Sequence, residues 1–340
     1  MPIHPSPNWR QLIYLALLAL AVFFLLPHFI GFEKILQIVL NANPIFLTFA
    51  LCAETSRYFT SAGSTISLAR LFQRKVPLFS MTEAFFGGAS LNRTFSTGGA
   101  PGMLVRLIFL AKHSVSAGSV AAIFLIEDLI GLLIGGGVVL IGLVTLLNTQ
   151  PDALATDLAA SFVIGSILLG LASLYIFRNR SGVEKIIHGL ARAIDKLLKR
   201  FFNRSAYDAV RLQHALDDFY LGLAAARQAP RFVVASFLFN VLRYIGGALT
   251  LYFTFHALNQ TIAPGVLILL YTTASLLSTT SAVPGEVAIM GTGFAILFLA
   301  LGLAPAVAVV ALILSRALAF WLPMPIGLLA LVHLRRKNEI

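Results

Sequence analysis

The fold of this chain is decided by Ser96-Thr97-Gly98-Gly99-Ala100-Pro101-Gly102, a run rich in glycine and proline inside the apolar region 80–111. A second run, Ser281-Ala282-Val283-Pro284-Gly285, interrupts the apolar region 265–303 in the same way. Because glycine and proline break helices, each region is predicted to fold back on itself as a hairpin. Broken backbone at membrane depth is tolerated only where it is buried in protein or lines a water-filled cavity. We expect the first hairpin, whose arms are short, to be re-entrant, whereas the arms of the second are long enough to span.

The composition places the chain in a membrane. Of its 340 residues, 58% are hydrophobic and 11% are charged, whereas about 25% of residues are charged in ordinary globular proteins. The net charge of +11 raises the question of nucleic-acid binding. Basic residues beside apolar spans are better explained by the positive-inside rule, and no base-stacking or groove-reading motif accompanies them. A single cysteine, Cys52, excludes a disulfide framework and a multi-cysteine metal site.

The remaining apolar stretches are long enough to cross the membrane as helices. A helix needs about 20 mostly apolar residues to cross about 30 Å of hydrocarbon. The stretches of this length are 12–30, 44–70, 115–147, 155–177, 231–257 and 304–334. No convincing signal-peptide cleavage site follows the first, so we expect it to be retained. The predicted fold class is therefore an all-α integral membrane protein, a single domain over 1–340 with about six full transmembrane helices and two broken hairpins.

The loops predict the orientation of the chain. Basic residues collect in the loops of one side, and most densely in the segment 178–230. This side should be the cytoplasm of a bacterial inner membrane, with both termini in it. Between 183 and 202, apolar residues recur at helical spacing among lysines and arginines, which predicts a helix that lies in the anionic leaflet or packs on the bundle.

The sequence also contains two units that resemble each other. Arg57-Tyr58 is followed 44 residues later by Pro101-Gly102, and Arg243-Tyr244 is followed 41 residues later by Pro284-Gly285. These units, 44–147 and 231–334, should cross the membrane in opposite directions. That is an inverted repeat, the architecture of many alternating-access transporters, although an apolar chain with many glycines and prolines also produces such short matches by chance.

Charged side chains inside apolar helices are the candidate substrate-binding residues. A charge at the bilayer centre costs about 2.5–3.5 kcal/mol, so such residues usually pair and face the bundle interior. Together with Asn92, which precedes the first break, the candidates are Glu54, Arg57, Arg93, Arg106, Glu127, Asp128, Arg243, Glu286 and Arg316. No cluster has the spacing of a metal site, and we expect neither a metal nor a cofactor.

The roles of these residues are left open at several positions. Glu54 and Arg57 lie three residues apart on one helical face, where they form either a structural ion pair or part of a substrate site. The simplest partner for the acids at 127 and 128 is Arg243 or Arg316, across the repeat axis. Arg93 and Arg106 flank the first break, where a helix N-terminus and an arginine would bind a phosphate, unless both side chains extend to the cytoplasmic interface.

Motifs of soluble enzymes are missing. The sequence contains no H-E-x-x-H, no G-x-S-x-G, no Walker A loop and no dinucleotide-binding glycine turn. We therefore expect no catalytic residue and no enzymatic activity. An intramembrane enzyme built from the acids at 127 and 128 and the arginines remains an alternative. Glu286, directly after Gly285, has an ordinary explanation as a helix cap.

Taken together, the motifs resemble a known family. They are Asn92-Arg93, the break up to Pro101-Gly102, Arg106, the acids Glu127-Asp128, the long basic loop, and the late Pro284-Gly285 break followed by Arg316. This pattern resembles the lysylphosphatidylglycerol synthase transmembrane family, also called the flippase-like domain of multiple peptide resistance factors. Only a six-residue tail follows the last predicted span, so we expect no soluble aminoacyl-transferase domain and no synthase activity.

The resemblance implies a lipid flippase. Such a protein would move a phospholipid or a polyprenyl-phosphate-linked lipid between leaflets through a midplane cavity, with arginines holding the phosphate and acids neutralising them in the empty state. The alternative is a non-transporting membrane partner of a glycosyltransferase or lipid synthase. The expected partners are thus a membrane lipid with an anionic or phosphate head group, and in the alternative a membrane enzyme.

Overall fold

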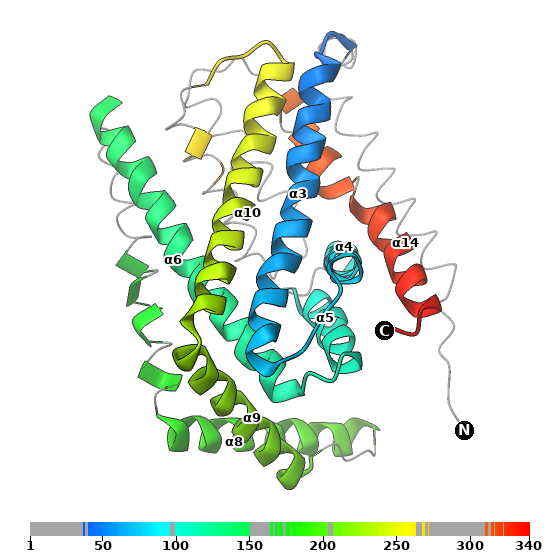
Figure 1. The fold of residues 1–340 in the computed structure, drawn as a ribbon, viewed down its shortest axis with the longest axis vertical. Helices are drawn as coiled ribbons and strands as arrows, with labels where there is room; N and C mark the ends of the chain where they lie inside the picture. The colour runs from blue at the N-terminus through cyan, green and yellow to red at the C-terminus, as the bar shows by residue number, and fades with distance from the viewer. Residues whose placement is uncertain are drawn as a thin grey trace.

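The computed structural model describes residues 40–95, 99–149, 179–202, 207–262, 317–321 and 323–340, together with scattered positions between these ranges and at 37. Every regular element in these residues is helical, which confirms the all-α class (Figure 1). The elements are α3 (Pro44–Ala69), η1 (Arg70–Phe72), α4 (Leu78–Phe95), α5 (Ala100–Lys112), α6 (Ala117–Thr149), α8 (Arg180–Phe202), α9 (Ala209–Gln228), α10 (Pro230–Ala257), η2 (Ala317–Trp321) and α14 (Pro323–Arg336).

Three stretches of the described residues are long and apolar enough to cross a membrane. They are Ala117–Val138 in α6, the whole of α10, and Ala317–Arg336, which covers η2 and α14. The chain is therefore a helical membrane protein. The predicted span 12–30, most of the predicted span 155–177, and nearly all of the second hairpin lie outside the described residues, so the full count of spans stays a prediction.

Helices α3 and α10 form a long antiparallel pair, visible side by side in Figure 1. The amide of Asn43, which caps α3, donates to the carbonyl of Ala257 at the end of α10 with an N···O distance of 2.8 Å. The 26-residue α3 is long enough to span but less apolar than α10, and it buries polar residues such as Ser64 and Thr65. The opposite directions of α3 and α10 are those that an inverted repeat requires, but the repeat itself also involves the undescribed second hairpin and stays a prediction.

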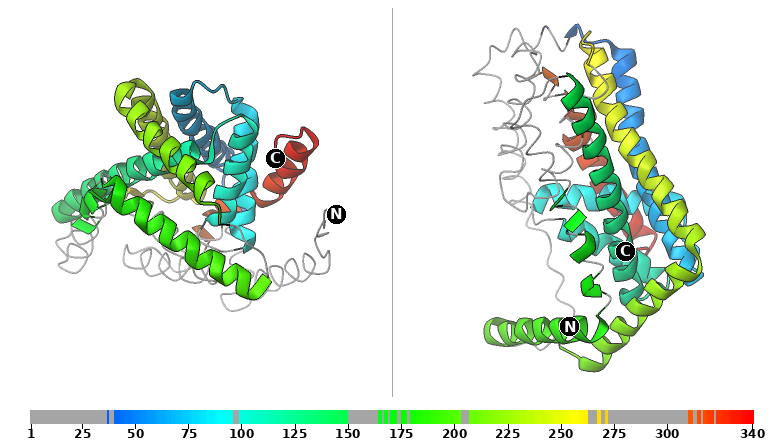
Figure 2. Two further views of the ribbon diagram at one scale, coloured as in Figure 1. Left: turned by 90° about the horizontal axis from the view of Figure 1, so that it is seen from below. Right: turned by 90° about the vertical axis from the view of Figure 1, so that its left-hand side faces the viewer.

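The first predicted hairpin is formed by α4 and α5. Gly99 has a φ of 85°, a left-handed conformation that suits glycine, and α5 begins at the next residue. The side chain of Asn92 closes the turn, because its Oδ1 accepts from the amide of Gly102 at 2.6 Å. Figure 1 shows α4 end-on, so the helix crosses α3 instead of running alongside it, and Figure 2 shows it from the side.

Helix α14 packs against α4 through small residues. The Ser90 hydroxyl of α4 donates to the carbonyl of Met324 at 3.0 Å. A β-carbon at Gly327 would collide with the carbonyl of Phe86, so the two helix backbones approach each other closely, as small residues allow between membrane helices. The C-terminal helix thereby holds the first hairpin in place.

The basic segment forms α8 and α9 at one end of the molecule, where α8 lies across the ends of the long helices (Figures 1 and 2). Arg180 pairs with Glu184 on α8 and with Asp217 on α9, and its hydrogen bond lowers the pKa of the Glu184 carboxyl. The helix predicted within 183–202 is thus present. One face packs on α9, whereas Ile186 and Leu190 on another face are 58% and 59% exposed.

An apolar core joins α3, α4, α5 and α6 at the end where α3 terminates. Leu68, Met81, Phe109, Leu110 and Ile123 are fully buried in it. These contacts fix the short hairpin helices against the long ones. The polar side chains that α5 and α6 direct at α3 are therefore held by packed helices.

Candidate functional site

The centre of the candidate site is a buried ion pair between the hairpin and α6. Arg106 lies in the middle of α5 and pairs through Nη2 with the carboxylate of Glu127 on α6. The two side chains are only 15% and 12% exposed. Arg106 therefore points into the bundle and does not extend to the interface.

Two hydroxyl groups from α3 complete the surroundings of this pair. Thr65 donates to Oε1 of Glu127 at 2.5 Å and accepts from Arg106 at 2.9 Å, so one hydroxyl joins both charged groups. The Ser64 hydroxyl lies 3.4 Å from the same carboxylate oxygen. Glu127 thus receives hydrogen bonds from two helices, α3 and α5, whereas Nε of Arg106 is buried without a hydrogen-bond partner among the described residues.

Aromatic rings enclose the guanidinium of Arg106. Its Cζ lies 4.4 Å from the ring centroid of Phe85 on α4 and 4.4 Å from that of Phe124 on α6. A guanidinium between two ring faces is stabilised by cation–π attraction and is restricted to one plane. Because the rings cover the two faces of the guanidinium, the N–H groups along its edge are the part that can bind an anion.

The polar network continues from α3 to α10. Ser64 and Ser236 share a hydrogen bond of 2.8 Å, and the amide of Asn240 donates to Ser64 at 2.8 Å. Ser64, Ser236 and Asn240 are at most 4% exposed. A continuous chain of hydrogen-bonding side chains therefore links Glu127 to the antiparallel partner of α3.

A second charged cluster lies at the midpoint of α3. Arg57, the 14th of 26 residues, donates to Glu54 at 2.7 Å, which is the pair predicted from their spacing. Glu54 is nearly fully buried and also lies 3.4 Å from the hydroxyl of Thr250 on α10. A β-carbon at Gly246 would lie 3.0 Å from Cγ of Arg57, so the glycine makes room for the arginine stem.

Arg243 lies at a similar depth on α10, as the 14th of 28 residues. Its guanidinium carbon is 5.5 Å from the ring of Tyr244, whose hydroxyl donates to the carbonyl of Gly131 on α6 at 3.3 Å. Tyr244 and Arg57 both contact Tyr271, with centroid distances of 6.0 Å and 5.8 Å. The two central arginines are therefore connected through tyrosine rings.

The two polar residues before the hairpin break bind other parts of the protein. Asn92 closes the turn, as described above, and Arg93 binds the hydroxyl of Tyr58 at 3.1 Å and the carbonyl of Ala319 in η2. The Tyr58 ring stacks on Phe86 with centroids 3.8 Å apart. Arg93 therefore connects α4 with α3 and η2.

The structure separates the two acids that are adjacent in sequence. Glu127 pairs with Arg106 from within the same predicted unit, 44–147, whereas the sequence predicts Arg243 or Arg316 as the simplest partner. Asp128 is exposed on α6 and lies within electrostatic range of Arg106 and Arg243. Arg316, Glu286, Pro284, Gly285 and Gly98 lie outside the described residues.

Sequence reasoning missed the uncharged part of the site. Ser64, Thr65 and Asn240 lie in apolar helices. Because polar side chains at membrane depth need hydrogen-bond partners, this position in the sequence could have marked them as site residues. Phe85 and Phe124 carried no signal, since aromatic residues are common in such helices. Within the described residues, no group of three or more histidine, cysteine, aspartate or glutamate side chains could hold a metal ion.

Comparison with known proteins agrees with this architecture. The family described as the lysylphosphatidylglycerol synthase TM region matches residues 11–327. A curated relative, the UPF0104 membrane protein PH1989 of Pyrococcus horikoshii, is 22% identical over 305 residues, which cover 87% of this chain and 89% of the relative. Because the match extends over most of the sequence, including the hairpin, the buried pair and α10, the chain belongs to the lysylphosphatidylglycerol synthase transmembrane-region family.

Proposed function

We propose that the protein is a lipid flippase of a bacterial inner membrane, with both termini in the cytoplasm. It moves a phospholipid or a polyprenyl-phosphate-linked lipid between the leaflets, and its buried arginines hold the phosphate of the head group. Membership of a family named for a membrane lipid synthase supports a lipid-related role. The ring-enclosed pair of Arg106 and Glu127 is the observation that carries the proposal.

The energetics of this pair favour a ligand role over a stabilising one. Removing two charges from water costs several kcal/mol each, and apolar residues of similar volume often replace a buried pair at no loss of stability. Apolar side chains at 106 and 127 would pack α5 against α6 without that cost. A site that must receive an anion does need a buried cation, together with an acid that neutralises it when the site is empty.

Exchange of the two anions is the chemistry that the geometry supports. A phosphate oxygen replaces the Glu127 carboxylate at Arg106, whose planar donors suit phosphate. The released Glu127 keeps its hydrogen bond from Thr65, which joins both groups in the empty state. The carboxylate therefore remains partly satisfied while the lipid is bound.

A second phosphate-binding position lies toward the midpoint of the bilayer. Arg57 precedes Ser64 by seven residues on α3, which is about 10 Å along a helix. Arg57 and Arg243 lie at the middle of their helices, so a phosphate released by Arg106 meets them next. The hydroxyls and the amide between these levels supply hydrogen bonds along the way.

The proposal is tested with purified protein in proteoliposomes. Fluorescent phospholipids with different head groups are placed in one leaflet, and their appearance in the other is measured by dithionite quenching, with and without an ion gradient. We expect head-group-dependent translocation by the wild type, a strong loss in Arg106→Gln, and partial recovery in Arg106→Lys, because ammonium lacks the bidentate fork. Arg211→Gln is the matched control, since this arginine side chain is 88% exposed on α9.

Two results would count against the flippase. Translocation by Arg106→Gln at the wild-type rate, in protein that inserts normally, would remove the pair from the mechanism. Wild-type protein that moves no lipid of any head group would favour the non-transporting partner of a membrane enzyme.

A further inference from the structure

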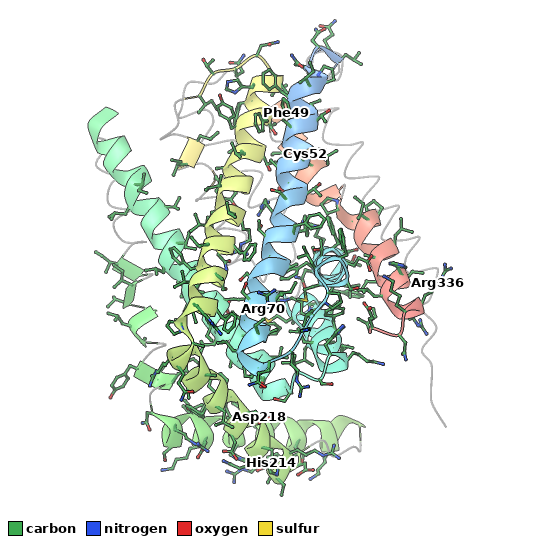
Figure 3. The ribbon with its side chains drawn as sticks, in the orientation of Figure 1. Phe49, Cys52, Arg70, His214, Asp218 and Arg336 are labelled. Atoms are coloured by element: carbon green, nitrogen blue, oxygen red, sulfur yellow. The ribbon has the colours of Figure 1, made fainter. Side chains whose placement is uncertain are left out.

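A cationic cleft lies at the end of α3, and its lining includes neither residue of the buried ion pair. Its volume is about 510 Å³, and its lining comprises Ile66, Arg70, Gln73, Arg74, Lys75, Val76 and Phe232. Figure 3 labels Arg70 at this end of α3, opposite Phe49 near the other end. Arg70 follows Thr65, the hydroxyl that joins the buried ion pair, by five residues, a separation of about 8 Å along a helix.

The backbone fixes the cations of this cleft. Gln73 has a φ of 58°, its amide donates to the carbonyl of Arg70 at 3.0 Å, and the amide of Arg74 donates to that of Ala69 at 3.4 Å. These two bonds form a Schellman motif, which ends the helix and turns the chain sharply. Arg70, Arg74 and Lys75 are thereby brought around one cleft.

The charge of the cleft is uncompensated. Its lining contains three cations and no carboxylate. In the described ranges, no ion pair or hydrogen bond engages the side chains of Arg70, Arg74 and Lys75, and all three are exposed. An anion with several acceptor oxygens would neutralise them.

One wall of the cleft is apolar. Ile66 is in the last turn of α3, Phe232 is in the first turn of the candidate span α10, and Val76 lies between the cations and α4. Farther along α10, Val234 and Leu238 are 54% and 56% exposed, as expected for side chains that face lipid tails. The cleft therefore lies where head groups meet hydrocarbon.

We propose that this cleft binds an anionic phospholipid of the cytoplasmic leaflet, with the phosphate between Arg70, Arg74 and Lys75 and the glycerol backbone and upper acyl chain along Ile66 and Phe232. A soluble phosphate would use the cations but not the apolar wall. The cleft shares no side chain with the proposed translocation site, so lipid binding to it is measured without reference to flippase activity.

The test is native mass spectrometry of the full chain in an uncharged detergent. Phosphatidylglycerol and phosphatidylcholine of the same short chain length are titrated separately, and the bound fraction gives an apparent Kd. The pocket variant carries Arg70→Gln, Arg74→Gln and Lys75→Gln, and the control variant, with equal loss of charge on exposed residues of α14 and the tail after it, carries Arg335→Gln, Arg336→Gln and Lys337→Gln.

We expect phosphatidylglycerol to bind wild type and control variant alike, more tightly than phosphatidylcholine, and to bind the pocket variant at least about tenfold more weakly. Phe232→Ser should weaken lipid binding, and inorganic phosphate at equal concentration should not displace the lipid.

Equal losses of phosphatidylglycerol affinity in the two triple variants would show that overall charge, and not the cleft, determines binding. Displacement of the lipid by inorganic phosphate would show that the cleft binds a free anion instead. An unchanged pocket variant would also overturn the proposal. Thermal unfolding midpoints identify any variant that is misfolded. If the triple variant is misfolded, the single exposed change Arg74→Gln repeats the test, and it should also weaken phosphatidylglycerol binding.

Discussion

Replacing Arg106 by methionine is the sharpest test of the buried pair. The change removes the ion pair to Glu127, the hydrogen bond to Thr65 and the stacking on two phenylalanine rings, but it keeps a long apolar side chain. Glu127, whose side chain is 12% exposed, then keeps only the bond from Thr65 and a weaker contact to Ser64. Leaving a buried charge without its partner costs roughly 3–5 kcal/mol, and we expect a loss of stability in this range.

The double variant separates pairing from packing. Glu127→Met alone leaves the arginine buried and unpaired, so it should also destabilise the protein. With Arg106→Met and Glu127→Met together no charge is left, and the loss should fall short of the sum of the two single losses by at least about 2 kcal/mol. The free energy of unfolding is measured by reversible denaturation with dodecyl sulfate in mixed micelles.

An exposed pair at the start of α9 provides the control cycle. Arg211 and Asp208 are 3.2 Å apart, with side chains 88% and 49% exposed. Their coupling should be below about 0.5 kcal/mol, since water screens exposed pairs. If the Arg106 and Glu127 changes are additive within about 0.5 kcal/mol, the two charges do not stabilise each other and the empty state of the proposed site is incorrectly described.

Three further predictions concern other parts of the fold. Gly102→Ala should lower the thermal unfolding midpoint, because a β-carbon there would lie 2.5 Å from the side-chain nitrogen Nδ2 of Asn92; an unchanged midpoint would show that the turn adapts freely. The hydrogen bond from Arg180 lowers the pKa of Glu184, so this pair within α8 stabilises the helix above the usual pKa of 4.5, and the contribution is lost as the pH falls below it; hydrogen-exchange protection factors in α8, corrected for the intrinsic exchange rate, that are equal at pH 7 and pH 3.5 would contradict this. In a cysteine-free background, Ser181→Cys should react with a membrane-impermeant thiol reagent only from the cytoplasm and Thr261→Cys only from outside, and labelling from the same side would refute the predicted orientation.

The fold could be predicted where the signal is local. The break before Gly102 follows from proline and glycine chemistry, and the pair of Glu54 and Arg57 follows from helical spacing. The partner of Glu127 could not be predicted in this way, because it depends on which helix lies beside α6. The sequence favours Arg243 or Arg316 as the partner, whereas the packing of α5 on α6 brings Arg106 to Glu127.

The uncharged residues of the site also could not be grouped from the sequence alone. Ser64, Thr65 and Asn240 could have been recognised as polar groups in need of partners, yet nothing in the sequence indicates that they meet one another. Phe85 and Phe124 enclose Arg106 only because α4 and α6 both pack against α5, each bringing one ring to the guanidinium. Tertiary geometry therefore decides the parts of the site that are shared between helices.

The attachment of each acid distinguishes the two charged clusters. Glu54 and Arg57 lie on one helix, so their bond of 2.7 Å persists however α3 moves. Glu127 and Arg106 lie on α6 and α5, so any displacement of the hairpin against α6 changes their separation. A transporter that alternates between two states needs a charge pair that is closed in one state and open in the other, and in the described part of the chain the pair between α5 and α6 has that property at membrane depth. We therefore expect a bound lipid phosphate to separate Arg106 from Glu127 while leaving Glu54 and Arg57 paired.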